Sequence, residues 1–211
     1  PPTREQGTDK PGRSFSSVLA DAQKLGYAEA DPTLDVGGGD SGHKLALLTA
    51  LAFGCRPDFS SLSLDGIERL TAEDIAISGE LGYRIKLIGQ SARLDDGRIL
   101  QMVSPCLVPK TAPLAHVSHV LNGIFVRGNF VGPSFIEGRG AGEGPTASAI
   151  VADIIDIARG RTGSVFGMKV DDLGAPPAAS RDDWTGEFYI RLVVDDRPGV
   201  IADIAPILRD H

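Results

Sequence analysis

Several features that mark particular classes of protein are scarce in this chain. Only two of its 211 residues are cysteines, Cys55 and Cys106, and they stand far apart and outside any Cys-x-x-Cys motif. Two isolated thiols do not form a disulfide scaffold and fit a reducing compartment, so we expect both to be small packing residues. No apolar run approaches the roughly 20 residues that a membrane-spanning helix needs.

Positive charge is also in deficit. The chain has 21 Lys and Arg against 28 Asp and Glu, which gives a formal net charge of -7, and it has no basic stripe. This balance argues against binding to nucleic acid. A hydrophobic content of 42% with 23% charged residues is typical of soluble globular proteins. We therefore expect a cytoplasmic protein that has neither a nucleic acid nor a membrane as its partner.

The periodicity of the apolar residues indicates an α+β fold. The Asp95-Asp96-Gly97 sequence predicts a hairpin between two strands, and Thr71 with Asp74 resembles a capping box at a helix start. We predict a mixed or antiparallel sheet that is covered by helices on one face. Helices are expected at 14–24, 40–53, 72–81, 145–159 and 200–209, and strands at 83–92, 98–108, 123–130 and 187–194.

The ends of the chain differ in composition from its middle. Residues 1–13 are polar and rich in Pro and Gly, and we expect a disordered leader there. Residues 161–183 are rich in Gly, Pro, Ala and Asp, which is typical of a linker. The strand and helix that follow cannot bury a core alone, so we expect the chain to stop inside a second domain.

The densest group of polar residues lies between Glu29 and Lys44. Asp40 and Lys44 are four residues apart and share one face at the start of a helix, which Asp40 can cap. The helix is otherwise nearly apolar after its first turn. We therefore expect it to be mostly buried, with the Lys44 ammonium pointing into a cleft where it can donate a proton. Several carboxylates nearby suit a ligand that carries an ammonium group. The alternative is an acidic loop followed by a surface ion pair.

A second candidate site is the glycine-rich stretch from Gly138 to Thr146, which precedes a predicted helix. Such a helix start can bind an anion, but the stretch is neither a Walker loop nor a GxGxxG motif. The alternative is a tight turn that lets helix and sheet pack closely. His116 and His119 are three residues apart but have no evident third ligand, so we predict no metal site.

Several of these segments closely resemble the homoserine dehydrogenase family. The similarity covers about residues 13–160 in the right order. A shorter similarity links the tail to the first strand and helix of an ACT regulatory module. The family resemblance rests on 26–33, 35–36, 40–45, 81–87, 140–142 and 145–148, and the ACT resemblance on Phe188 with 196–200. The family resemblance implies a substrate and dimerisation domain at 14–160. After the linker at 161–183, the ACT resemblance implies a partial ACT-like βα unit at 184–211.

The resemblance also implies a reaction, the reduction of aspartate semialdehyde to homoserine with NADH or NADPH. This step leads to threonine, methionine and isoleucine. Lys44 is implied as the acid-base residue, in a protein that forms a homodimer. Substrate binding is implied for Glu29 and Asp40, with Asp35 and Tyr27 lining the pocket, and contact with the cofactor for Gly26, Gly140 and Gly142.

Two departures from the family pattern limit this expectation. The sequence lacks the nucleotide-binding domain that precedes this region in the family, and Gly39 stands where the family usually has an apolar residue. We therefore expect a fragment of an NAD(P)-dependent dehydrogenase that holds most substrate-binding groups, binds cofactor poorly and is inactive alone. The alternative is a catalytically inert module for dimerisation and amino-acid binding.

Overall fold

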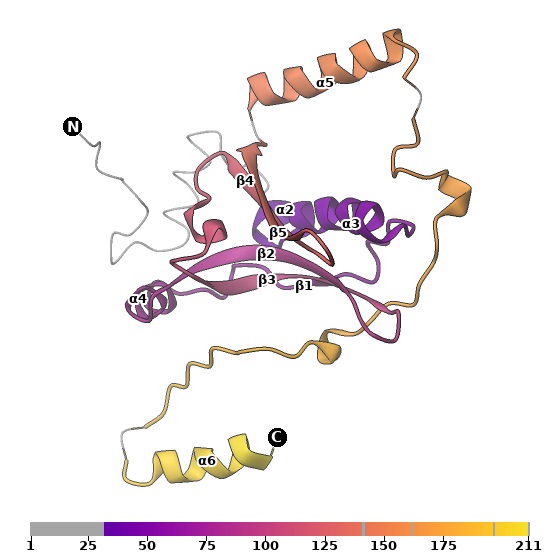
Figure 1. Cartoon of the computed structure of the whole chain (residues 1–211). Coiled ribbons are helices and arrows are strands. Elements are labelled where there is room, and N and C mark those ends of the chain that lie inside the picture. Colours follow the sequence, from indigo (N-terminus) through magenta and orange to yellow (C-terminus); the bar gives the residue numbers. More distant parts are fainter. Residues whose placement is uncertain (1–31, 141, 162, 196, 211) are drawn as a thin grey trace, which may run out of the picture.

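The computed structural model describes residues 32–140, 142–161, 163–195 and 197–210. The predicted leader and the predicted helix at 14–24 lie outside these residues. The described chain is an α+β fold built on two small sheets (Figure 1).

The larger sheet has three strands in the order β1-β3-β2, with β1 (Ser63–Leu64) parallel to β3 (Ile99–Pro109) and β2 (Tyr83–Arg93) antiparallel to it. The predicted hairpin is confirmed, because the Leu94 and Arg98 backbones pair at 2.9 Å and Gly97 has a φ of 85° between them. Only glycine adopts such a φ without strain. The mixed sheet predicted from the sequence is therefore present.

Helices α2 (Thr33–Val36) and α3 (Gly39–Phe53) cover one face of this sheet (Figure 1). Helix α3 ends at Gly54, as predicted, where φ is 63°. Gly89 of β2 faces this helix, because a Cβ there would be in ordinary van der Waals contact with Leu45, 3.4 Å from its Cδ1. Helix α4 (Ala72–Glu80) begins with the predicted capping box, in which the Asp74 N–H donates to Thr71 Oγ1 and the Thr71 N–H donates to Asp74 Oδ2.

The prediction that α3 is mostly buried is wrong for one of its faces. Leu45, Ala46, Thr49 and Ala50 are buried, but Leu47, Leu48 and Leu51 are 51%, 38% and 52% exposed. The helix therefore carries two apolar faces, of which the sheet covers one. A run of apolar residues does not show which face the fold covers. We call Leu47, Leu48 and Leu51 the leucine stripe.

The smaller sheet is an antiparallel pair, β4 (Leu121–Gly128) and β5 (Gly132–Arg139). The sequence predicted one strand at 123–130, so β5 was missed. Phe130 and Val131 lie in the exposed turn between the strands, although their apolar side chains favour a strand. Helix α5 (Glu143–Ala158) follows with Pro145 in its first turn, as predicted, and it projects away from both sheets (Figure 1).

Two basic residues of β2 hold the crossover between β3 and β4, which contains the 3₁₀ turn η1 (Pro113–His116). Arg84 Nη1 donates to the Ala115 carbonyl at 3.1 Å, and Lys86 Nζ donates to the Val117 carbonyl at 2.6 Å. Burial lowers the pKa of Lys86, and the charge of Arg84 lowers it further. The crossover therefore contributes hydrogen-bond acceptors to two side chains of the larger sheet.

The stretch predicted to be a linker contacts the larger sheet. The Ile99 N–H donates to the Pro177 carbonyl at 3.0 Å, and the Ala179 N–H donates to the Ile99 carbonyl at 2.9 Å. Ala179 packs with Leu100 and Met102 in the core, beside the partly buried Leu94 and Trp184. The 3₁₀ turns η2 (Val170–Asp172) and η3 (Arg181–Asp183) flank this contact. The division of the chain into domains stays a prediction.

The tail departs from its predicted form in one respect. The strand expected at 187–194 is extended chain without a strand partner among the described residues, whereas helix α6 (Val200–Asp210) forms as predicted. A strand needs a neighbour to accept its hydrogen bonds. The ACT-like unit is therefore not confirmed.

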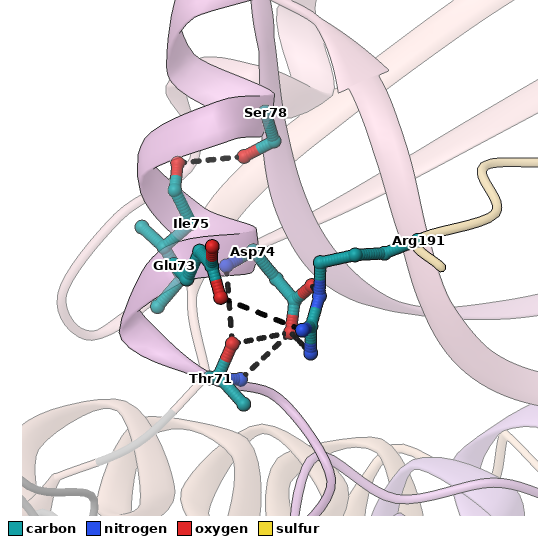
Figure 2. Close-up of polar contacts among 6 residues, drawn as sticks. All are labelled: Thr71, Glu73, Asp74, Ile75, Ser78 and Arg191. Atoms are coloured by element: carbon teal, nitrogen blue, oxygen red, sulfur yellow. Dashed lines mark hydrogen bonds and ion pairs between the residues drawn. The ribbon is translucent and has the colours of Figure 1, made fainter. Parts of the chain in front are cut away.

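Arg191 ties this extended tail to the start of α4 (Figure 2). Its Nε donates to Asp74 Oδ1 at 2.6 Å, and its guanidinium also lies 3.4 Å from Asp74 Oδ2 and from Glu73 Oε2. Burial alone would raise the pKa of Asp74, but hydrogen bonds from Arg191 and Thr71 outweigh it and lower the pKa to about 2. The same carboxylate thus caps α4 and anchors the tail.

Replacing Arg191 with methionine should raise the pKa of Asp74 from about 2 toward its ordinary 3.8. A carboxyl group whose pKa is lowered in the folded state stabilises it above the unfolded pKa, and this stability is lost as the pH falls toward the folded pKa. The wild-type chain should therefore lose stability between about pH 4 and pH 2, and the variant should lose less over that interval. Carbon-detected NMR titration of the Asp74 carboxyl and urea unfolding at several pH values measure both effects.

Arg197→Met is the matched control, because Arg197 pairs at 2.7 Å with Asp203 of α6, where both side chains are exposed. It should leave the titration of Asp74 unchanged. An Asp74 pKa that stays near its wild-type value in Arg191→Met would show that Arg191 does not hold this carboxylate.

Candidate substrate pocket

The backbone before α3 is shaped by a run of glycines. Residues 33–36 form the short helix α2, for which no helix was expected, and in it the Val36 N–H donates to the Pro32 carbonyl at 2.8 Å. Gly38 then adopts a φ of 81° and occupies the N-cap position of α3. A side chain at Gly38 would be strained by this φ and would also approach Val103 Cγ1 within 3.0 Å. We call residues 33–39, which contain α2 and the glycine run, the pocket loop.

Asp40 and Lys44 form the predicted pair in the first turns of α3. Lys44 Nζ donates to Asp40 Oδ2 at 2.6 Å. The prediction that the Asp40 side chain caps the helix is wrong, because the N-cap is Gly38 and no side chain caps it. Asp40 instead lies in the first helical turn, where the positive end of the helix favours a carboxylate.

The expectation that Lys44 points into a cleft also differs from the structure. The side chains of Lys44 and Asp40 are 62% and 47% exposed. The physical reason is helical spacing: positions 40, 44, 47, 48 and 51 fall on one face, so the pair continues into the exposed leucine stripe. An exposed pair of this spacing contributes only about 0.3–0.5 kcal/mol to stability. Its ammonium can nevertheless donate a proton to a ligand bound on this face.

The remaining predicted site residues are distributed as follows. Asp35 is exposed on α2, and Val36 separates it from the glycine run. Gly26, Tyr27 and Glu29 lie outside the described residues, and their predicted roles stay predictions.

The glycine-rich stretch has its own local geometry. Gly140 packs tightly against the Asn122 amide, which a Cβ at this position would overlap. Gly142 has a φ of 109° at the N-cap of α5. At Gly140 this supports the tight-turn alternative. Within the described ranges, no hydrogen bond or ion pair joins this stretch to Asp40 or Lys44.

Sequence reasoning missed the loop that follows β1. The Ile67 N–H donates to the Val36 carbonyl at 2.9 Å, and the Asp65 N–H donates to the Val103 carbonyl at 2.8 Å. This loop therefore joins the pocket loop to the sheet. The Asp65-Gly66 dipeptide was a turn signal, but nothing in it indicates which backbone it packs against.

Other features of the described chain bear on the type of site. Both cysteines are free, and burial raises the pKa of Cys55, which packs as predicted. Among the described residues, no three His, Cys, Asp or Glu side chains gather closely enough to hold a metal ion. None of the helices in the described part of the chain is both long and apolar enough to span a membrane.

Comparison with known proteins shows which protein family this α+β domain belongs to. The family model described as homoserine dehydrogenase matches residues 5–155. A homoserine dehydrogenase of Neisseria gonorrhoeae is 44% identical over 204 residues, which cover 93% of this chain and 46% of that protein. The crystal structure of a homoserine dehydrogenase from Thiobacillus denitrificans has a TM-score of 0.81 and 39% identity, and the match covers 96% of this chain and 48% of that one.

A third solved structure bears on the cofactor. It is a hyperthermophilic archaeal homoserine dehydrogenase in complex with NADPH, which has a TM-score of 0.55 and 28% identity, with coverage of 71% of this chain and 41% of that one. The chain belongs to the homoserine dehydrogenase family. It spans about half the length of the curated relatives that it matches.

Proposed function

We propose that this chain is the substrate domain of an enzyme that reduces aspartate 4-semialdehyde to homoserine. The observation that carries the proposal is the Asp40–Lys44 pair at 2.6 Å, which lies on an exposed face of α3 inside the region that matches the family. On this proposal the exposed face is where the substrate binds, and the pocket loop holds it there.

The chemistry of the substrate suits these residues. The substrate carries an ammonium group, which Asp40 and Glu29 bind as carboxylates, and Asp35 and Tyr27 line the same pocket. Its carbonyl oxygen gains negative charge as hydride reaches the carbonyl carbon, and Lys44 donates a proton to that oxygen. The aldehyde CHO group becomes CH2OH: the hydride supplies two electrons and one hydrogen to the carbon, and Lys44 supplies the proton to the oxygen and is left as a neutral amine.

A reduced nicotinamide cofactor, NADPH or NADH, supplies the hydride when it is bound. The described residues fit such a group in one respect: the leucine stripe continues from Lys44 and offers an exposed apolar wall for a flat ring. We propose that Gly26, Gly140 and Gly142 approach the nicotinamide end. The archaeal relative solved with NADPH supports a nicotinamide cofactor and leaves the choice between NADPH and NADH open.

We also propose that the parent enzyme is a homodimer in the cytoplasm, which takes part in the biosynthesis of threonine, methionine and isoleucine. The dimer is inferred from the family resemblance. The free thiols of Cys55 and Cys106 are compatible with a reducing compartment.

A second candidate function is an inert module for dimerisation and amino-acid binding. The exposure of Lys44 and Asp40 favours it, because an acid-base group works best where water is excluded. On this alternative the chain holds the amino acid but turns over nothing.

The experiment that separates the two candidates is an assay of the 211-residue chain beside its full-length parent. Both receive aspartate semialdehyde with NADPH or NADH, and the loss of reduced cofactor is followed by absorbance. We expect turnover by the parent, a large loss of that turnover in the Lys44→Met parent, and none by the chain alone. A Lys44→Met parent as active as the wild type would favour the inert module. Turnover by the isolated chain would refute the module, whereas a parent that consumes no cofactor with this substrate would refute the dehydrogenase.

A further inference from the structure

Gly66 lies in the loop between β1 and α4, against the backbone of the pocket loop. A Cβ at this position would overlap the Val36 carbonyl oxygen and would lie 2.8 Å from Gly37 Cα and 2.7 Å from Glu68 Oε2. Gly66 is not among the glycines with positive φ, so its backbone conformation is open to other residues. It is therefore space, and not conformation, that requires glycine here.

The loop around Gly66 is fixed to the sheet on its other side. Asp65 donates to the Val103 carbonyl at 2.8 Å, and Ile67 donates to the Val36 carbonyl at 2.9 Å. The Val103 side chain also supports Gly38, because its Cγ1 would lie 3.0 Å from a Cβ there. The pocket loop is thus held between two supports, the backbone at 65–67 and the side chain of Val103.

We propose that Gly66 is a positioning residue, which sets the place of the pocket loop and, through it, of Asp40 and Lys44. The inference rests on the proposed function. Two of the three atoms that a Cβ would meet belong to backbone, namely Val36 O and Gly37 Cα, so neither can rotate away as a side chain can. A methyl group at position 66 therefore displaces the backbone of Val36 and Gly37. Only Gly38 and Gly39 separate these two residues from Asp40.

The test is Gly66→Ala in the full-length parent. A misplacement of about 1 Å can cost about 10²-fold in rate. We therefore expect kcat for the semialdehyde to fall roughly 10–100-fold, while KM for the cofactor changes by less than about threefold. Steady-state kinetics are measured well below the melting temperature of the variant, so that only folded enzyme contributes.

Gly79→Ala is the matched control. Gly79 lies inside α4, where a Cβ meets only Lys110 Nζ at 4.0 Å. Alanine is the better helix former by about 1 kcal/mol, so this variant should be at least as stable as wild type and fully active.

The double variant Gly66→Ala/Glu68→Ala tests which neighbour matters. It removes the flexible Glu68 side chain and leaves the backbone atoms of Val36 and Gly37 in place, so its kcat should remain low. Recovery of kcat in the double variant would place the clash on Glu68 and overturn the role of the backbone.

The double variant Gly66→Ala/Glu68→Ala also covers the case in which Gly66→Ala alone does not fold, because it removes one of the three atoms that a Cβ at position 66 would meet. We expect this double variant to be folded and still slow. A wild-type parent without activity would count against the proposed function, whereas an active parent whose folded Gly66→Ala form keeps wild-type kcat would overturn the present inference alone.

Discussion

Replacing Lys44 with methionine in the full-length parent should lower kcat for semialdehyde reduction by roughly 10²–10⁴-fold, which is the contribution of a positioned acid-base group. Methionine keeps most of the length of the side chain but has no proton to donate to the carbonyl oxygen. KM for the cofactor should change little, because the lost interaction develops as charge grows on that oxygen. Steady-state kinetics with each substrate varied in turn separate the two effects.

Stability should hardly change in this variant. The Lys44–Asp40 pair is exposed, so its loss costs about 0.5 kcal/mol or less. Lys169→Met is a suitable control, since Lys169 is exposed and lies far from α3 in the sequence. A Lys44→Met enzyme that keeps turnover within a few-fold of wild type would remove Lys44 from the proposed chemistry.

Replacing Leu100 with alanine should lower the free energy of unfolding of this chain by about 2–5 kcal/mol, the range for buried leucines. Leu100 is 1% exposed on β3, where it packs with Met102 and with Ala179 of the C-terminal stretch. The substitution leaves a cavity between the sheet and that stretch. Urea denaturation, followed by the fluorescence of Trp184, the chain's one tryptophan, measures this loss, because Trp184 packs beside the same core cluster.

Leu51→Ala is the matched control for Leu100→Ala, because it makes the same chemical change at a side chain that is 52% exposed. It should cost well under half as much as the buried substitution. Equal losses in the two variants would contradict the core assigned here, and would indicate that the leucine stripe is covered in solution.

Local signals in the sequence were sufficient to predict where several helices and turns begin and end. The Asp-Gly turn, the Thr71 capping box and the glycine that ends α3 each act within a few residues, and the structure confirms all three. The Asp40–Lys44 pair was predicted for the same reason, since helical spacing alone brings the two side chains together.

Contacts between distant parts of the chain could not be predicted in this way. The packing of Ala179 on Leu100 and the anchoring of Arg191 by Asp74 depend on segments that meet only after folding. The exposure of Lys44 depends on which face of α3 the sheet covers, and a helix with two apolar faces does not reveal that. The support of the pocket loop by Gly66 was missed because the sequence shows only a turn there.

The most direct test of the proposed function follows the hydride itself. The full-length parent is supplied with aspartate semialdehyde and with NADPH that carries deuterium at the transferable position, and the product is examined by NMR and mass spectrometry. We predict homoserine with one deuterium on the carbon that bears the new hydroxyl group, in an amount that falls with Lys44→Met. Unlabelled homoserine, or no homoserine from an enzyme that is folded and binds the cofactor, would contradict this account.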